Sequence, residues 1–192
     1  MGTSGSQSPP AGAAFLHTPL GWVCVVAKNG RVIAASLPAA AKAEAATVCP
    51  AVCRLGSADG LLQAVIGDLR RYFHGERVDL SRHPVDVSAQ PAFLRQALLG
   101  ARRIPYGEVR SYGWVARAAG NPRAARAAGQ AMSRNPVPLL IPCHRVVGAG
   151  GRLTGFGGGL ALKRTLLELE GAVCNAHRVA PTRHDTKSRR RR

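Results

Sequence analysis

The run Pro142-Cys143-His144-Arg145 places a thiol, an imidazole and a guanidinium next to one another. A thiol is a weak nucleophile until it ionises, and a neighbouring cation or a helix N-terminus lowers its usual pKa of about 8.5. A sulfur beside a base and a cation is therefore a candidate nucleophile. The alternative is an inert cysteine buried beside an apolar strand, which is the commoner position of a free cysteine. The residues alone leave both interpretations open.

The segments before Cys143 predict how it is positioned. An apolar run between prolines, residues 135–141, leads directly to it. Further upstream, Ser111 is a predicted N-cap of a helix that ends at Gly120, and Asn121 is a predicted cap of a second helix with Pro122 at its first position. Two helices joined by so short a turn favour a helix-turn-helix.

The second predicted helix has almost no bulky side chains. Small residues leave it slim, with arginines projecting from it, and a slim helix can bring its backbone close to a partner surface. The alternative is that these alanines are simply good helix formers packed against neighbours. The small residues are Ala124, Ala125, Ala127, Ala128 and Gly129, and the arginines are Arg123, Arg126 and, further on, Arg134.

The charge of the chain favours a polyanionic partner. The 27 lysines and arginines against 10 aspartates and glutamates leave a net charge of +17, typical of proteins that bind nucleic acid. Residues 1–90 carry +2, residues 91–172 carry +9 and residues 173–192 carry +6. The second half of the chain therefore carries the predicted DNA-binding surface.

The first half predicts a small α+β unit. Asn29-Gly30 between two β-prone runs predicts a hairpin. From Ala58 onward, apolar residues recur every three and four positions, which predicts an amphipathic helix that ends near Gly75. A connector follows at 84–91, and then a helix around 93–98 that ends before the turn-forming Pro105 and Gly107.

Five cysteines without regular spacing, and no amino-terminal signal segment, predict an intracellular protein. No apolar run is long enough to cross a membrane. Cys49 and Cys53 lack a second matched pair at zinc-site spacing, even with Cys24, His17 and His83 considered, so we expect no metal and no cofactor.

The sequence from Pro105 to Gly171 resembles the O6-alkylguanine-DNA alkyltransferase family. The matching motifs are Pro105-Tyr106-Gly107-Glu108-Val109, Ser111-Tyr112, Arg123 to Gly129, Asn135-Pro136-Val137-Pro138, Pro142 to Gly148, Leu153 to Gly159, Lys163, Leu166-Leu167 and Glu170-Gly171. Thr18 to Gly21 also resembles the opening strand of that family's amino-terminal domain.

The resemblance implies an α+β fold in two domains. A small N-terminal α/β domain, ribonuclease H-like, is expected at residues 15–88, and a mostly helical C-terminal domain with the helix-turn-helix at 89–172. By composition, residues 1–14 are predicted to be a disordered leader and residues 173–192 a disordered basic tail. The expected compartment is the nucleus in a eukaryote, and the cytoplasm or nucleoid in a bacterium.

The implied activity is single-turnover DNA repair. One alkyl group moves from guanine O6 to Cys143 after the damaged nucleotide is flipped out of double-stranded DNA, and thymine O4 is a further candidate source. The protein would be a cysteine S-methyltransferase that is not regenerated. The resemblance implies a monomer, leaves clustering on DNA open and implies no membrane partner.

The resemblance also implies site residues. The catalytic set is Cys143 as acceptor, His144 as base through a water, Glu170 orienting His144, Tyr112 donating to the purine and Asn135 bracing the cysteine turn. The DNA-binding set is Arg126, which replaces the flipped nucleotide, with Ala124, Ala125, Ala127, Arg123 and Ser111. The substrate pocket is Pro138, Val146, Phe156, Gly157 and Lys163, the lysine supporting the loop 155–159.

Three of these roles have a structural alternative: Tyr112 as a cap of the first helix of the pair, Glu170 as one of several surface carboxylates on a Leu-rich helix and Lys163 as a solvated charge. The chain also departs from the family pattern, with Leu98 for a core tryptophan, Ala128 for valine, Phe156 for tyrosine, and Gly157 where a larger residue often contacts the alkylated oxygen. These departures affect the expected substrate range and rate.

Two other classes of function fit parts of the sequence. A non-catalytic module that binds alkylated bases would have the same helices but no acceptor cysteine, whereas this chain has Cys143. A DNA-binding regulator would read the major groove with the second helix. The slim helix and Arg126 favour repair over regulation.

Overall fold

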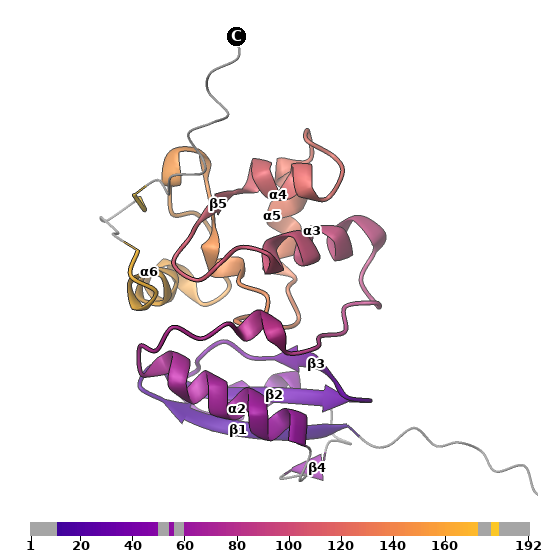
Figure 1. The fold of residues 1–192 in the computed structure, drawn as a ribbon, viewed down its shortest axis with the longest axis vertical. Coiled ribbons are helices and arrows are strands. Elements are labelled where there is room, and N and C mark those ends of the chain that lie inside the picture. Colours follow the sequence, from indigo (N-terminus) through magenta and orange to yellow (C-terminus); the bar gives the residue numbers. More distant parts are fainter. Residues whose placement is uncertain (1–10, 50–53, 56–59, 173–177, 181–192) are drawn as a thin grey trace, which may run out of the picture.

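The computed structural model describes residues 11–49, 54–55, 60–172 and 178–180. Figure 1 shows two parts, a sheet with helix α2 and, beside it, a group of helices that holds the second half of the chain. The predicted α+β fold class agrees with this architecture.

The first part is built on a four-stranded sheet with the order β3-β2-β1-β4. Its strands are β1 (Gly12–Thr18), β2 (Gly21–Lys28), β3 (Arg31–Ala35) and β4 (Arg54–Leu55). β1, β2 and β3 pair antiparallel, and β4 joins β1 in parallel. The predicted hairpin is confirmed: Asn29 and Gly30 both have positive φ, 51° and 69°, as a two-residue turn of type I′ requires.

The first strand begins earlier than the composition predicts. Residues 12–14, which were expected to belong to a disordered leader, pair with β2, and Ala13 is fully buried. Small residues fit here because this face of the sheet, which includes Cys24 of β2, packs against Ala45 of α1. Residues 1–10 of the predicted leader lie outside the described residues.

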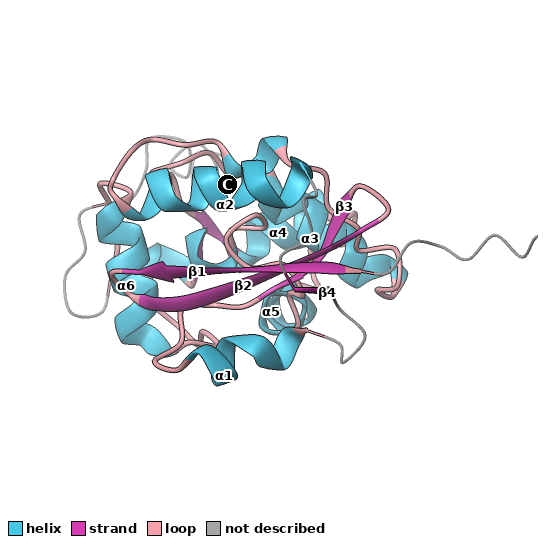
Figure 2. Ribbon diagram, turned by 90° about the horizontal axis from the view of Figure 1, so that it is seen from below, coloured by secondary structure: helices cyan, strands magenta, loops and turns pink. Residues whose placement is uncertain are grey.

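Helices cover both faces of this sheet (Figure 2). The short α1 (Lys42–Ala45) lies on one face, and α2 (Gly60–Phe73) lies on the other. The apolar side chains of α2 recur at helical spacing and pack on the sheet: Leu62, Val65, Leu69, Tyr72 and Phe73 are buried. The helix ends before Gly75, whose φ of +84° is unfavourable for other residues.

The second part contains four helices and a small two-stranded sheet. The helices are α3 (Ala92–Arg102), α4 (Tyr112–Ala118), α5 (Ala125–Ser133) and α6 (Gly159–Leu169), and the parallel strands are β5 (Arg110–Ser111) and β6 (Val146–Val147). Short 3-10 turns lie at Ala46–Val48, Leu80–Arg82, Cys143–Arg145 and Ala149–Gly151.

One hydrophobic core joins the two parts. It contains strand residues such as Val25 and residues of the second part such as Val115 and Leu140, all fully buried. A backbone hydrogen bond of 2.9 Å from Ala35 to Pro136 also ties the sheet to the segment that leads to Cys143. The sheet therefore packs against the segment that leads to Cys143 and helps to fix its position.

The helix pair forms with one correction. Ser111 caps α4 as predicted, because its side chain accepts a 3.2 Å hydrogen bond from the Trp114 amide. The second helix begins at Ala125 and not at Pro122. The Asn121 side chain accepts from the amide of Arg123 at 3.2 Å, which closes a turn two residues on instead of capping a helix.

The predicted disordered tail is ordered at residues 178–180. Val179 is 2% exposed and packs among Val109, Leu153 and Leu167. Its amide donates a 2.8 Å hydrogen bond to the carbonyl of Gly151. The apolar side chain of Val179 thus packs into a hydrophobic cluster, which the basic composition of the segment does not predict. Residues 173–177 and 181–192 lie outside the described residues.

Candidate active site

Cys143 lies at the start of a tight turn that its neighbours hold in place. Its own amide donates to the carbonyl of Ile141 at 2.8 Å. The Asn135 side chain donates to that same carbonyl at 2.8 Å and accepts from the amide of Val137 at 3.0 Å. Asn135 therefore ties the beginning of the apolar run to its end, directly before the cysteine.

His144 forms a buried pair with Glu170. Its Nε2 lies 2.9 Å from Oε1 of Glu170, and both residues are almost fully buried. The other ring nitrogen, Nδ1, is buried without a hydrogen-bond partner among the described residues. Burial lowers the pKa of His144, although Glu170 counteracts this. A neutral ring that donates from Nε2 leaves Nδ1 as a proton acceptor.

Glu170 is the centre of a larger hydrogen-bond network. Its carboxylate accepts from the Tyr72 hydroxyl at 2.8 Å, from the Gly107 amide at 3.1 Å and from Arg145 at 2.8 Å through both Nε and Nη2. Burial alone would raise the pKa of Glu170, but His144 and Arg145 outweigh it and hold that pKa far below its usual value. The carboxylate stays ionised and fully hydrogen bonded, as a buried charge requires.

Arg145 does not act on the sulfur as its position in the sequence suggests. Its guanidinium points to Glu170 and also donates to the carbonyl of Ile104 at 2.7 Å. Burial raises the pKa of Cys143, and the Asn135 side chain and the charge of Lys163 only partly counteract this. Cys143 is 5% exposed, and this burial favours the protonated thiol. Arg145 is therefore not the cation that activates Cys143 in this arrangement, because its guanidinium pairs with Glu170.

Lys163 is a fully buried cation beside this site. Its Nζ donates to the carbonyl of Val146 at 2.6 Å and to that of Thr154 at 3.2 Å. Burial lowers its pKa to about 8, while Cys143 counteracts this. The lysine thus joins β6 to the segment just before the loop 155–159, and it is not a solvated charge.

Tyr112 lies at the first position of α4, against α5. A Cβ atom added at Gly129 would stand 3.8 Å from its ring, and the ring centroid lies 5.9 Å from Nζ of Lys163. Burial raises the pKa of Tyr112, an effect that the nearby Thr154 side chain partly offsets. The phenol therefore keeps its proton and can donate it.

The remaining predicted pocket residues differ in exposure. Pro138 and Val146 are buried, Phe156 is half-buried and Gly157 is exposed. Nζ of Lys163 lies 5.9 Å from the centroid of the Phe156 ring, which places this aromatic side chain near the same cation as Tyr112.

The predicted DNA-binding residues lie on the outer side of the helix pair. Arg123 and Arg126 are exposed, and Ala124, Ala125 and Ala127 are partly exposed. Ala128, in contrast, is fully buried in the core. Both interpretations of the alanines thus apply, each to different positions: one alanine packs inward, and the others leave a slim outer surface.

Sequence reasoning did not find two members of the site. Tyr72 was assigned to the apolar face of its helix, and only its phenol oxygen, out of place in an apolar stripe, could have indicated a polar partner. Gly107 was assigned to a turn. A Cβ at Gly107 would approach the Glu170 carbonyl to 2.9 Å, and the φ of Gly107 is +76°. Both the lack of space and the backbone conformation therefore require glycine here.

The described residues contain no group of three or more histidine, cysteine, aspartate or glutamate side chains placed to hold a metal ion. Cys53 lies outside them. Within the same part of the chain, no helix is long and apolar enough to span a membrane.

Family models match both parts of the chain. Residues 13–87 match the ribonuclease-like domain of 6-O-methylguanine DNA methyltransferase, and residues 92–172 match its DNA binding domain. These matches define a two-domain protein of the alkyltransferase class. The chain belongs to the 6-O-methylguanine DNA methyltransferase family, and the resemblance drawn from its motifs is confirmed.

Individual proteins named as methylated-DNA--protein-cysteine methyltransferases also match this chain in sequence. The chain is 48% identical over 114 residues to the methylated-DNA--protein-cysteine methyltransferase of Mycobacterium leprae, across 58% of this chain and 67% of that protein. It is 45% identical over 105 residues to the Methanosarcina acetivorans protein of the same name, across 54% and 65%. The Homo sapiens protein is 43% identical over 136 residues, across 67% and 64%. The matched region thus spans about two thirds of these relatives.

Solved structures share the fold. The crystal structure of Mycobacterium tuberculosis O6-methylguanine methyltransferase superposes with a TM-score of 0.67 at 32% identity, covering 86% of this chain and 96% of that one. The M. tuberculosis OGT in complex with DNA gives a TM-score of 0.69 at 33% identity, covering 82% and 91%. The predicted α+β fold is therefore confirmed.

Proposed function

We propose that this protein repairs alkylated DNA by moving one alkyl group from guanine O6 to Cys143, in a single turnover. The observation that carries the proposal is the buried arrangement of Cys143, His144 and Glu170, in which the unpaired Nδ1 of His144 is the proton acceptor nearest in sequence to the sulfur. The relatives are named for this transfer.

The chemistry balances with these residues alone. The Cys143 thiol gives its proton to His144, through a water in the family's mechanism, and the sulfur attacks the alkyl carbon. A carbon–sulfur bond forms as the carbon–oxygen bond breaks, and the bonding electron pair goes to the guanine. Tyr112 donates a hydrogen bond to the leaving purine, and the guanine takes up one proton for the one that the thiol lost.

The surrounding charges favour the ionised sulfur only when a substrate is present. Burial opposes the charged form of both the thiol and the imidazole, because it raises the pKa of Cys143 and lowers that of His144. Glu170 stabilises an imidazolium once His144 takes the proton, as the carboxylate of a hydrolase triad does. Lys163 stabilises the thiolate, because its cation lowers the pKa of Cys143.

Double-stranded DNA is the proposed partner. Residues 91–172 carry +9, and the M. tuberculosis relative has been crystallised with DNA. The minor groove is only about 6 Å wide, so the partly exposed alanines of α5 let its backbone approach where larger side chains would not. Arg126, exposed near the start of α5, is proposed to enter the base stack in place of the flipped nucleotide.

The pocket for the flipped base is proposed to lie between Tyr112, Val146 and Phe156, with Pro138 as a further wall. Lys163 holds this pocket wall in place, because its Nζ donates hydrogen bonds to the carbonyls of Val146 and Thr154. Asn135 keeps the cysteine turn in place. The exposed Gly157 leaves one side open, which suits a wider range of alkyl groups, and thymine O4 adducts are included in the proposal.

Mass spectrometry of the reacted protein tests the transfer. After incubation with a duplex containing O6-methylguanine, we expect one added methyl group on the peptide that contains Cys143. Cys143→Ser should abolish the adduct and leave duplex binding intact, while Cys24→Ser, at a buried cysteine of the sheet, should keep the adduct. Methyl transfer that persists in Cys143→Ser would overturn the proposal. Duplex binding without any transfer would identify a damage-binding module instead.

The role of Arg126 has its own test. Arg126→Ala should reduce repair in duplex DNA by at least tenfold and change transfer from free O6-benzylguanine less than twofold, because the free base needs no flipping. Arg117→Ala, on the neighbouring helix α4, is the matched control. Equal losses on both substrates would contradict the proposed role of Arg126.

A further inference from the structure

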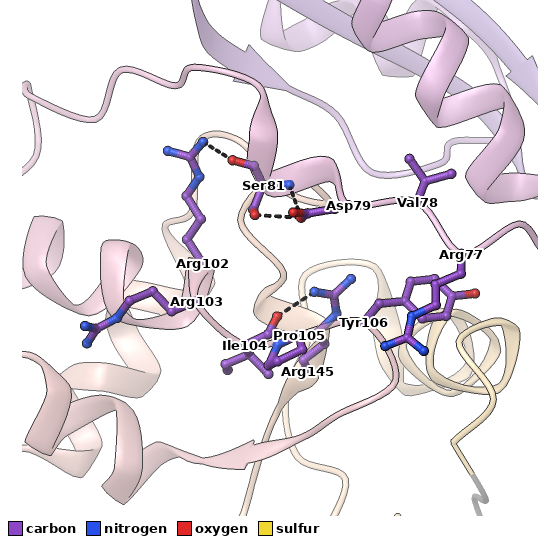
Figure 3. Close-up of a pocket in the computed structure, with 10 residues that line it drawn as sticks. All are labelled: Arg77, Val78, Asp79, Ser81, Arg102, Arg103, Ile104, Pro105, Tyr106 and Arg145. Atoms are coloured by element: carbon purple, nitrogen blue, oxygen red, sulfur yellow. Dashed lines mark hydrogen bonds between the residues drawn. The ribbon is translucent and has the colours of Figure 1, made fainter.

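A cavity of about 430 Å³ opens where the two parts of the molecule meet, away from the helix pair (Figure 3). The segment from Arg77 to Ser81 forms one wall. The end of α3 and the following turn, residues 102–106, form the other together with Arg145. No lining residue belongs to α4 or α5, so this cavity is separate from the surface proposed to hold DNA.

The lining is strongly positive. It contains four arginines, Arg77, Arg102, Arg103 and Arg145, and one carboxylate, Asp79. Asp79 already accepts from the Ser81 amide at 2.9 Å and from the Ser81 hydroxyl at 2.6 Å. Three of the five N–H donors of Arg145 are already engaged by Glu170 and by the Ile104 carbonyl.

The other three arginines have no carboxylate within ion-pair distance in the described part of the chain. Arg77 and Arg103 are exposed at the mouth of the cavity. Positive charges that lie close together repel one another, so this cluster is unfavourable unless an anion joins it.

Arg102 gives the second observation. Its Nη2 donates to the carbonyls of Ser81 at 2.6 Å and His83 at 2.5 Å, which fixes the guanidinium in place. Its Nε is buried and has no hydrogen-bond partner among the described residues. Burial also lowers the pKa of Arg102, an effect that Asp79 only partly offsets. The buried Nε is out of reach of a ligand, so Arg102 contributes to this cavity through its fixed positive charge, which no carboxylate pairs with among the described residues.

We propose that this cavity is a binding site for a small phosphate-bearing ligand, a polyphosphate or the phosphate group of a mononucleotide. Arginine guanidinium groups bind phosphate oxygens in a fixed two-point geometry, and four arginines line this cavity from both of its walls. The volume falls within the range of about 300–1,000 Å³ that is usual for small-molecule sites. The proposal does not depend on the alkyl transfer proposed above.

Calorimetric titration at constant ionic strength tests the site. Pyrophosphate and adenosine monophosphate are titrated separately, against sodium chloride as a blank, and we expect one molecule bound per chain for at least one of them. The double variant Arg77→Ala/Arg103→Ala should weaken that binding at least tenfold. Arg31→Ala/Arg70→Ala, which removes two exposed arginines outside the cavity, should leave it within twofold.

A second variant guards against loss of fold. Asp79→Asn removes the only carboxylate of the lining while keeping an oxygen that can accept from Ser81, so pyrophosphate should bind several-fold more tightly. A gain of affinity does not arise from unfolding. Tightening in Asp79→Asn together with weakening in the double arginine variant would establish the site.

Three results would overturn the proposal. Equal affinity in the wild type and in Arg77→Ala/Arg103→Ala would show that the anion binds elsewhere. Absence of saturable binding by either probe would leave only a positively charged surface. Displacement of pyrophosphate by an undamaged duplex, lost in the double variant, would assign these arginines to DNA phosphates and not to a small ligand.

Discussion

The molecule contains the same chemical grouping twice, with different consequences. In the first part, Asp68 accepts from His83 at 2.7 Å and from Arg82 at 2.7 Å. In the second part, Glu170 lies 2.9 Å from His144 and 2.8 Å from Arg145. Each is a buried carboxylate between a histidine and an arginine.

The surroundings of the two groups differ. The Arg82 side chain is 59% exposed, whereas that of Arg145 is 7% exposed. Water therefore solvates the Arg82 guanidinium of the first group, whereas only protein groups stabilise the Arg145 guanidinium of the second. Moreover, His144 adjoins a thiol in the sequence, and no cysteine follows or precedes His83. The pair of His144 and Glu170 is thus the candidate catalytic site, because its arginine is buried with it and a cysteine adjoins its histidine.

The largest difference is expected when each carboxylate is neutralised. Glu170→Gln leaves the charge of Arg145 buried without a counter-ion, so it should cost about 3–5 kcal/mol of stability and most of the transfer activity. Asp68→Asn should cost about 1–2 kcal/mol, because water reaches Arg82. Urea denaturation and transfer from O6-benzylguanine measure both. Equal losses of stability would show that exposure of the arginine does not distinguish the groups.

Removal of each histidine is expected to separate their roles in rate. His144→Gln should slow transfer about 10²–10⁴-fold, the usual contribution of a general base. His83→Gln should leave the rate within about twofold and change only stability. The measurement is single-turnover transfer on folded protein, checked by circular dichroism. A similar rate loss in both variants would place the acceptor for the thiol proton elsewhere.

The buried cation on the Cys143 side predicts a dependence of stability on pH. Lys163 has a folded-state pKa of about 8, below its usual value of 10.5. Between these values the unfolded chain binds more protons than the folded one, so the stability contributed by this residue rises as pH increases from about 8. The wild type should gain roughly 1–2 kcal/mol over Lys163→Met between pH 7.5 and 9.5 in urea denaturation. A constant difference would contradict the depressed pKa.

The smallest effect concerns the one partner of Glu170 that comes from the first part. Tyr72→Phe removes a single 2.8 Å hydrogen bond while four other bonds to the carboxylate stay, so it should cost about 1 kcal/mol. Tyr106→Phe, whose hydroxyl donates to the Leu169 carbonyl, is the matched control. A loss of transfer in Tyr72→Phe beyond tenfold, with stability kept, would make Tyr72 a positioning residue for His144.

Features set by near neighbours agreed with the structure. The Asn29-Gly30 hairpin, the Ser111 cap and the helix ends at Gly75 and Gly120 all depend on the backbone preferences of a few residues. The exception shows the limit: Asn121 is an equally good helix cap and turn former, and local chemistry does not decide between the two.

Glu170 was assigned through the resemblance of the motif around it and not through any local pattern. Its carboxylate meets Tyr72, which lies 98 residues away in the chain, and Gly107, which lies 63 residues away. The strand that begins at Gly12 and the anchoring of Val179 likewise depend on distant partners. Composition predicted disorder for both segments because it contains no information about those distant partners.

The sequence by itself determined that the thiol stands beside the imidazole, that Ser111 caps a helix and that the second half of the chain has a surplus of arginine. The tertiary structure decided where the charges act. It turned Arg145 away from the sulfur and toward Glu170, buried Lys163 and left an arginine cluster around a cavity. The reason is that burial in a medium of low polarity sets the strength of every charge interaction, and only contacts between distant segments determine burial.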